Sequence, residues 1–122
     1  MTIAQLVKSP VEGIPSLGLS LSDRHELHAH YMPFLKDAGL FVPTTEPFSL
    51  HQEIILQMRL AELGKRLTIP GRVVWLAPSQ GQRQTEPGIG LQFTGEHRHK
   101  VKQFIEDVLG DLVKQTPAQT AY

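Results

Sequence analysis

Residues 31–44 read YMPFLKDAGLFVPT, and this stretch carries the most distinctive local signals of the chain. Pro33 cannot continue a helix, so any helix that leads into the stretch must end before it. Gly39 precedes the apolar run LFV at 40–42, which predicts a short strand that Pro43 closes. The stretch contains no nucleophile, acid/base pair or cluster of ligands, so we expect it to serve structure or recognition.

The residues before this stretch predict a strand followed by a short helix. Residues 14–22, IPSLGLSLS, alternate leucines with small or polar residues, which is the period of a strand with one buried face. Asp23 has the side chain of a good N-cap, and Glu26, three residues later, completes a capping box. Residues 1–13 carry one short apolar group before a proline and a glycine, and we expect a flexible lead-in.

Three further strands are expected after the stretch. Residues 50–60, LHQEIILQMRL, fit a strand or a helix, and their central run of isoleucine and leucine suits a strand. Residues 61–65 contain a glycine and predict a hairpin turn. Residues 66–77, RLTIPGRVVWLA, form the clearest strand, with a bulge or bend expected at Pro70-Gly71. Residues 89–93 alternate again and predict the last strand.

A loop and a long helix complete the expected order. Residues 78–87, PSQGQRQTEP, have the composition of a loop. Gly88 and Gly90 indicate a close approach of the backbone or tight curvature at the last strand. Thr94 has the side chain of an N-cap, and apolar residues recur at helical spacing from 101 to 112, which predicts an amphipathic helix.

These elements predict a mainly β fold. We expect a small antiparallel β-barrel with a short helix after the first strand and a long C-terminal helix. A single domain should span residues 14–112, with flexible termini at 1–13 and 115–122. The sequence leaves open whether the C-terminal helix packs on the barrel or docks a partner.

Composition argues against several classes of function. The chain has 122 residues, 12 Lys and Arg against 12 Asp and Glu, a formal net charge of zero, and no cysteine. Without a basic excess we expect no nucleic-acid binding, and without cysteine the chain forms no disulfide or thiolate. No apolar run could cross a membrane and no signal peptide is evident, so we expect a cytoplasmic protein without membrane insertion. Near-neutral charge favours association with partners.

Neither a metal site nor a catalytic centre is expected. His25 and His28 of the sequence HELH are spaced i, i+3 rather than the i, i+4 of the zinc helix motif, and a metal would want a further ligand. The chain has no GxSxG, GxGxxG or P-loop sequence, and nothing pairs Glu53 or Glu62 for acid/base work. We therefore expect a protein that is not an enzyme and that holds no cofactor or metal ion.

Several aromatic residues suit either the core or a partner surface. Trp75 is the only tryptophan, and tryptophan is enriched at binding hot spots as well as buried in cores. Tyr31, Met32 and Phe34 raise the same choice, because together they carry more apolar surface than the end of one short helix easily hides. Exposed aromatic residues of this kind indicate a site for a protein partner.

The order of these features resembles the PilZ domain family, and within it the branch that assembles type IV pili. YMPFLKDAGLFVPT at 31–44 is the most specific part, and GRVVW at 71–75 and GIGLQF at 88–93 are weaker. The resemblance covers residues 14–112. PilZ domains are best known as receptors for cyclic di-GMP, which they bind with an RxxxR sequence and a D/N-x-S-x-x-G turn. The arginines clamp phosphates and stack on guanines.

This chain has neither motif. None of its arginines has another arginine four residues later, and no Ser-x-x-G sequence occurs. If Gly39 ends the turn motif, Phe34 stands at the Asp/Asn position and Lys36 at the Ser position. An aromatic ring cannot make that polar contact. The resemblance therefore implies the branch of the family that meets proteins and does not bind cyclic di-GMP itself.

The same resemblance implies a non-catalytic adaptor in type IV pilus biogenesis and twitching motility. The partners of that branch are the pilus extension ATPase PilB and, in some bacteria, FimX, a cyclic di-GMP receptor with a degenerate EAL domain. The related sequences commonly read LYxAYMPF where this chain reads LHAHYMPF, with His28 at the usual aromatic position. The partner-binding residues expected here are His28, Tyr31, Phe34, Trp75 and Pro78.

Two alternatives stay open. The protein could bind cyclic di-GMP directly at a nonstandard site, with Arg24, Arg66 and Arg72 as the arginines able to clamp it. It could also be a small barrel that binds single-stranded nucleic acid, although the neutral net charge argues against this.

Overall fold

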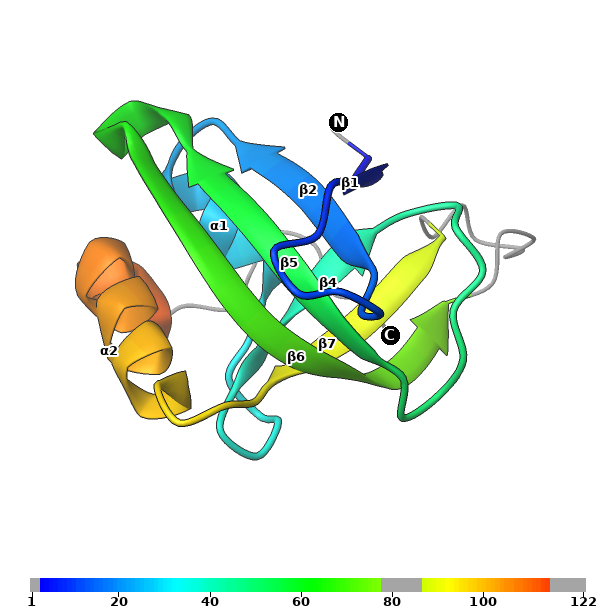
Figure 1. The fold of residues 1–122 in the computed structure, drawn as a ribbon. Helices are drawn as coiled ribbons and strands as arrows, with labels where there is room; N and C mark the ends of the chain where they lie inside the picture. Colours follow the sequence, from blue (N-terminus) through cyan, green and yellow to red (C-terminus); the bar gives the residue numbers. More distant parts are fainter. Residues whose placement is uncertain (1–2, 78–86, 115–122) are drawn as a thin grey trace.

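The computed structural model describes residues 3–77 and 87–114, in which seven strands form one sheet and two α-helices accompany it (Figure 1). In chain order the strands are β1 (Gln5–Val7), β2 (Ser16–Leu21), β3 (Tyr31–Met32), β4 (Gly39–Pro43), β5 (Glu53–Leu60), β6 (Lys65–Ala77) and β7 (Gly88–Phe93). The helices are α1 (Arg24–His30) and α2 (Arg98–Leu109), with 3-10 turns η1 (Ala61–Leu63) and η2 (Gly110–Lys114).

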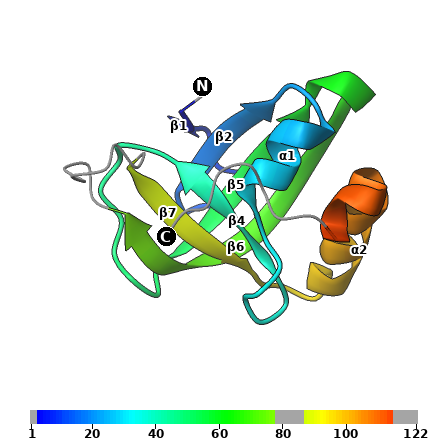
Figure 2. The same ribbon diagram turned by 180° about the vertical axis from the view of Figure 1, so that it is seen from behind.

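The sheet curls into a barrel-like form. Its strands lie in the order β1-β2-β5-β6-β7-β4-β3. Ala4 N–H donates a 2.7 Å hydrogen bond to the carbonyl oxygen of Pro43, which joins the residue before β1 to the end of β4 across the seam. Figure 2 shows α1 and α2 next to each other at one end of the barrel, where the two helices are in contact. The predicted mainly β, barrel-like fold with a long C-terminal helix is confirmed.

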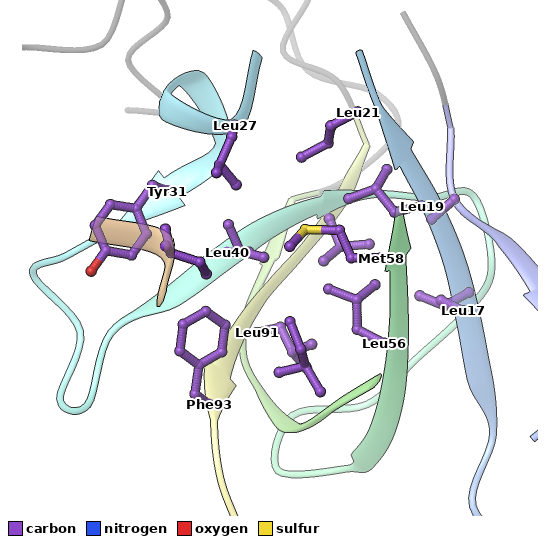
Figure 3. Packing of buried hydrophobic residues seen from close by; sticks show 14 of the residues in the cluster. Leu17, Leu19, Leu21, Leu27, Tyr31, Leu40, Leu56, Met58, Leu91 and Phe93 are labelled. Atoms are coloured by element: carbon purple, nitrogen blue, oxygen red, sulfur yellow. The ribbon is translucent and has the colours of Figure 1, made fainter. Parts of the chain in front are cut away.

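Alternate residues of the strands fill the interior (Figure 3). The largest fully buried side chains include Leu17, Leu19, Leu21, Leu40, Leu56, Met58 and Phe93. Full burial of each such side chain contributes on the order of 1.5–3 kcal/mol. Ile105 and Leu109 of α2 join the same cluster with no exposed surface. The C-terminal helix therefore packs on the barrel, which answers the question that the sequence left open.

The start of α1 follows the predicted cap. Glu26 N–H donates a 3.0 Å hydrogen bond to Oδ1 of Asp23, which has the extended backbone of an N-cap. In return, Oε1 of Glu26 accepts from the N–H of Ser22 at 2.6 Å and from its hydroxyl at 2.9 Å. The reciprocal contact thus reaches one residue further back than in the usual capping box. The helix ends at His30, before Pro33, as expected.

The expectation of a wholly antiparallel barrel is wrong at one pair of strands. β2 runs parallel to β5, with Ser16 opposite Ile55 and Leu21 opposite Leu60. A parallel pair needs a long crossover connection, and here α1, β3 and β4 lie between the two strands along the chain. The strand reading of residues 50–60 is confirmed by β5, and the predicted hairpin turn is η1 with Gly64 in the left-handed region at φ 61°.

The lead-in before residue 14 contains a strand that the sequence did not predict. Residues 5–7 form β1, antiparallel to β2, with Leu6 opposite Leu17. All three residues of β1 are exposed, so the strand shows no alternation of buried and exposed positions. As a result α1 follows the second strand and not the first. The expected tail at 115–122 lies outside the described residues, and the domain boundaries at 14 and 112 stay predictions.

The predicted bulge lies elsewhere in β6. Pro70 and Gly71 stay in register with β5, and the irregularity falls between Val73 and Trp75, opposite β7. Gly71 is required for packing instead, since a Cβ there would lie 2.5 Å from the side chain of Leu91. The extra residue between Val73 and Trp75 sets the direction in which the tryptophan points.

The long helix starts later than predicted. Its N-cap is His97, which makes no side-chain cap, and not Thr94. The N–H of Thr94 donates to Pro70 O at 3.0 Å, so this residue, which directly follows β7, is still hydrogen-bonded to β6. Gly95 follows with a left-handed φ of 86°, which separates Thr94 from the helix.

Candidate protein-binding surface

Three rings form a row, which we call the aromatic row: the buried His30 and the half-buried Phe41 and Trp75. The ring centroids of Phe41 and Trp75 are 5.8 Å apart with the planes tilted by 52°. His30 stacks on Phe41, with the ring centroids 6.3 Å apart and the planes at 16°. Its Nδ1 lies 2.9 Å from the carbonyl oxygen of Phe41, which fixes the imidazole in place. Phe41 and Trp75 therefore form a preorganised apolar surface, which the buried His30 supports.

Glycines of β7 make room for these rings. Gly90 lies opposite both Phe41 on β4 and Trp75 on β6. A Cβ on Gly90 would lie 3.0 Å from Cβ of Trp75, and a Cβ on Gly88 would lie 2.7 Å from Cζ of Phe41. The close approach predicted at Gly88 and Gly90 is confirmed, and its physical cause is the pair of aromatic side chains that lies over the strand.

The turn between β3 and β4 presents Phe34 to solvent, with 60% of its surface exposed. Asp37 and Ala38 close this turn with left-handed φ angles of 62° and 65°. The carbonyl oxygen of Lys36 accepts a 2.8 Å hydrogen bond from Nε2 of Gln92 on β7. Because this hydrogen bond holds the C-terminal side of the turn, Phe34 projects from a backbone segment with a fixed conformation.

The one carboxylate of this turn is already engaged. Oδ2 of Asp37 accepts a 3.1 Å charge-assisted hydrogen bond from Nε of Arg98, and His99 lies 3.9 Å from Oδ1. The Asp37 side chain is 19% exposed and that of Arg98 is 39% exposed. This contact joins the turn to the start of α2, and it leaves the turn with less capacity to bind a polar ligand.

Gly39, which ends the turn, has a structural reason to be glycine. A Cβ at this position would lie 2.2 Å from the carbonyl oxygen of Leu91. Gly39 faces Gln92 in the β4–β7 ladder, so the strands could not keep this pairing with a side chain here. Strand pairing therefore requires a glycine at position 39, whether or not the turn binds a ligand.

Tyr31 belongs to the core, and its expected role at a partner surface stays a prediction that its burial does not favour. The residue is 4% exposed, and Figure 3 shows its ring beside Leu27 and Leu40 with the hydroxyl directed away from them. The hydroxyl donates a 2.7 Å hydrogen bond to Oε2 of Glu106. Burial, and then the Glu106 carboxylate, raise the pKa of Tyr31 well above its ordinary value. The bond in turn lowers the pKa of Glu106, with help from Lys102 at 3.2 Å.

The other expected partner residues fall in different places. Phe34 is exposed and Trp75 is half-buried in the aromatic row, whereas His28 is only 9% exposed. Pro78 lies outside the described residues. Sequence reasoning did not predict that Phe41 or His30 would belong to this surface. A signal for Phe41 existed, because it alternates with the buried Leu40 and Val42 and must point outward.

Other functional classes find little support in the described part of the chain. Across residues 3–77 and 87–114 there is no group of three or more His, Asp or Glu side chains that could hold a metal ion. In the same ranges no helix combines the length and the apolar character that a membrane span requires.

Comparison with known proteins identifies the family. The model of the PilZ domain matches residues 15–108, which is most of the chain. A search of curated proteins gives no significant match. PilZ domains bind cyclic di-GMP or act as adaptors, and in general they are binding domains without catalytic activity. With its barrel-like sheet, its C-terminal helix and this match, the chain belongs to the PilZ domain family.

Proposed function

We propose that this PilZ domain is a non-catalytic adaptor in type IV pilus biogenesis and twitching motility. Its expected partners are a PilB-type pilus extension ATPase and, where one exists, a FimX-like protein with an EAL domain. The messenger cyclic di-GMP would then act through the partner. We also propose that the protein is cytoplasmic, as expected from the sequence.

The observation that carries the proposal is Phe34. It is the most exposed of the large apolar side chains in the described residues, at 60%, and it projects from a turn that hydrogen bonds hold in place. A large apolar ring kept in water by a rigid support is typical of a binding hot spot. The half-buried Trp75 and Phe41 add a second preorganised apolar surface on the same domain.

The chemistry of the turn supports a protein partner over a nucleotide. If Gly39 ends the turn motif, Phe34 and Lys36 occupy the positions at which the ligand-binding family members carry Asp or Asn and Ser. The carboxylate of Asp37 is taken by Arg98. Without an RxxxR sequence, the turn offers neither the guanidinium pair nor the free acceptors that phosphates and guanines need.

The alternative function is a direct cyclic di-GMP receptor, and family membership is the observation that favours it. Its candidate clamps are Arg24, Arg66 and Arg72. Arg66 and Arg72 both lie on β6, six positions apart, which is about 20 Å along a strand. That separation does not suit a clamp on a single phosphate, so we place this function second.

Isothermal titration tests the two functions against each other. The full chain is titrated with a purified PilB-type ATPase and, separately, with cyclic di-GMP. The adaptor proposal predicts saturable binding of the ATPase in the absence of nucleotide. It predicts no heat of binding when cyclic di-GMP is titrated into the chain. Micromolar or tighter binding of cyclic di-GMP, with no binding of the ATPase, would replace the adaptor by the receptor.

A further inference from the structure

A row of hydrogen-bond donors crosses the outer face of three strands, which we call the arginine row: Ser20, Arg59 and Arg66. Ser20 on β2 is the partner of Arg59 in the parallel ladder, and Arg59 on β5 lies directly opposite Arg66 on β6. All three residues are exposed, whereas the residues on either side of Ser20 and of Arg59 are buried. The three side chains therefore leave the sheet on the same face, next to one another.

The two arginines face each other without an opposite charge to neutralise them. Like charges directly opposite on a sheet repel each other and destabilise the pairing. The ion pairs found among residues 3–77 and 87–114 involve Asp37, Glu96 and Glu106, and none of them includes Arg59 or Arg66. A repulsive pair of this kind is relieved when one anion lies between the two guanidinium groups.

The surroundings of the row also supply donors and little negative charge. Thr68 is exposed two residues along β6 from Arg66 and adds a second hydroxyl to that of Ser20. Gln57, opposite Thr68, is occupied by hydrogen bonds to Lys8 O and to the hydroxyl of Ser16. The acids nearest along the chain are Asp23, three residues after Ser20, and Glu62, three residues after Arg59, and neither takes part in the ion pairs found in the described residues.

We propose that the arginine row binds a phosphate group, carried by a soluble phosphate ester or by a lipid headgroup. A phosphate offers several acceptor oxygens, so two guanidinium groups can donate to it at once, and the hydroxyl of Ser20 can donate as well. A single carboxylate has two acceptor oxygens and is matched by one guanidinium fork. The paired geometry therefore fits a phosphate better than the side chain of an acidic protein.

This site is separate from the proposed partner surface. Arg66 and Trp75 are nine positions apart on β6, which is about 30 Å along a strand. The turn from Phe34 to Gly39 lies beside β7 and α2, away from β2 and β5. Loss of one site should leave the other intact, so the two proposals fail independently.

Nuclear magnetic resonance tests the inference directly. The labelled full chain is titrated with inorganic phosphate at constant ionic strength, and the backbone signals and arginine Nε–Hε signals are followed. The proposal expects saturable shifts at Ser20, Arg59 and Arg66. Arg59→Gln should weaken the apparent affinity about threefold or more, and the double variant Arg59→Gln/Arg66→Gln should abolish saturation. Lys100→Gln, at an exposed cation of α2 that belongs to neither proposed site, is the matched control.

Further titrations separate the sources and the rival ligand. Glycerol 3-phosphate represents soluble esters, and vesicles of phosphatidylglycerol in phosphatidylcholine represent lipid headgroups. Binding of either that the double variant loses supports the proposal and identifies the source. Shifts that stay linear, or that survive in the double variant, would overturn it. Equal affinity for acetate would also overturn it and would point to an acidic protein segment instead.

Discussion

The hydroxyl of Tyr31 donates a 2.7 Å hydrogen bond to Oε2 of Glu106, and this bond joins β3 of the barrel to α2. Tyr31 is almost fully buried, whereas the Glu106 side chain is 26% exposed and is also 3.2 Å from Nζ of Lys102. The contact attaches the C-terminal helix to the barrel in addition to the packing of Ile105 and Leu109. An aromatic residue that the sequence assigned to a partner surface thus stabilises the fold.

Tyr31→Phe should lower the free energy of unfolding by about 1–2 kcal/mol at neutral pH. The ring keeps its packing, but the Glu106 carboxylate loses its buried donor. Urea denaturation of the variant and the parent protein measures the difference. A variant as stable as the parent would show that the hydrogen bond does not hold the helix.

The contribution of this bond should fall in acid. The folded-state pKa of Glu106 is lowered from 4.5, first by the hydrogen bond from Tyr31. Its stabilisation is therefore present above the unfolded pKa and is lost as the pH falls through the lower folded pKa. The stability gap between the parent and Tyr31→Phe should narrow between neutral pH and about pH 3. Urea midpoints across that range would contradict this if the gap stayed constant.

Gly90→Ala should displace the aromatic row without unfolding the protein. The new Cβ would lie 3.0 Å from Cβ and 3.4 Å from Cε3 of Trp75, so the indole must shift outward. Because Trp75 is the only tryptophan, its fluorescence reports this site alone, and we expect emission at longer wavelength with a loss of about 1–3 kcal/mol in stability.

Gly64→Ala is the matched control for Gly90→Ala. Gly64 has φ 61°, and a Cβ added there would have no other atom within 4 Å, so alanine meets backbone strain and no steric contact. It should cost about 1–2 kcal/mol and leave the tryptophan spectrum unchanged. Equal spectral changes in both variants would mean that the fluorescence reports the loss of stability of the whole domain and not a displacement of Trp75.

Gly39→Ala should be far more damaging than either of these changes. Its Cβ would meet the carbonyl oxygen of Leu91 at 2.2 Å, and backbone cannot move aside without breaking the β4–β7 ladder. We expect a loss of roughly 4 kcal/mol or more, seen as a large fall in the thermal midpoint by circular dichroism. A midpoint within a few degrees of the parent would contradict the assigned register of β4 and β7.

Much of the fold could be predicted because it depends on local signals. The alternation in residues 14–22, the Asp23 cap and the hairpin at Gly64 each appear in the structure. What failed depends on non-local contacts. The parallel pairing of β2 with β5 and the short strand β1 arise from the closure of the barrel, which no local pattern encodes.

The surface was predicted only in part for a related reason. An aromatic sequence indicates apolar surface but does not say which side chain is buried. Tyr31 is directed inward, while Phe34, three residues later in a turn, is directed to solvent. Phe41 joins Trp75 only because β7 lies between their strands and carries Gly90 at the shared position. That arrangement depends on strand order, which local sequence patterns do not determine.

Phe34→Ala should leave the stability of the fold almost unchanged, so that any loss of partner binding in this variant can be assigned to the ring itself. Because the side chain is 60% exposed, its removal should change the free energy of unfolding by no more than about 0.5 kcal/mol. Leu63→Ala, at a leucine 47% exposed in η1, should behave alike in denaturation and serves as the control for loss of exposed apolar surface. A large destabilisation by Phe34→Ala would show that the ring supports the fold.

The most direct test of the adaptor proposal is the affinity of a purified PilB-type ATPase for four proteins: the parent chain and its variants Phe34→Ala, Trp75→Ala and Leu63→Ala. The account predicts that Phe34→Ala and Trp75→Ala each weaken binding by about 2 kcal/mol or more, while Leu63→Ala binds like the parent and all four stay folded. Unchanged affinity in both aromatic variants would contradict the account and remove this surface from any role in partner binding.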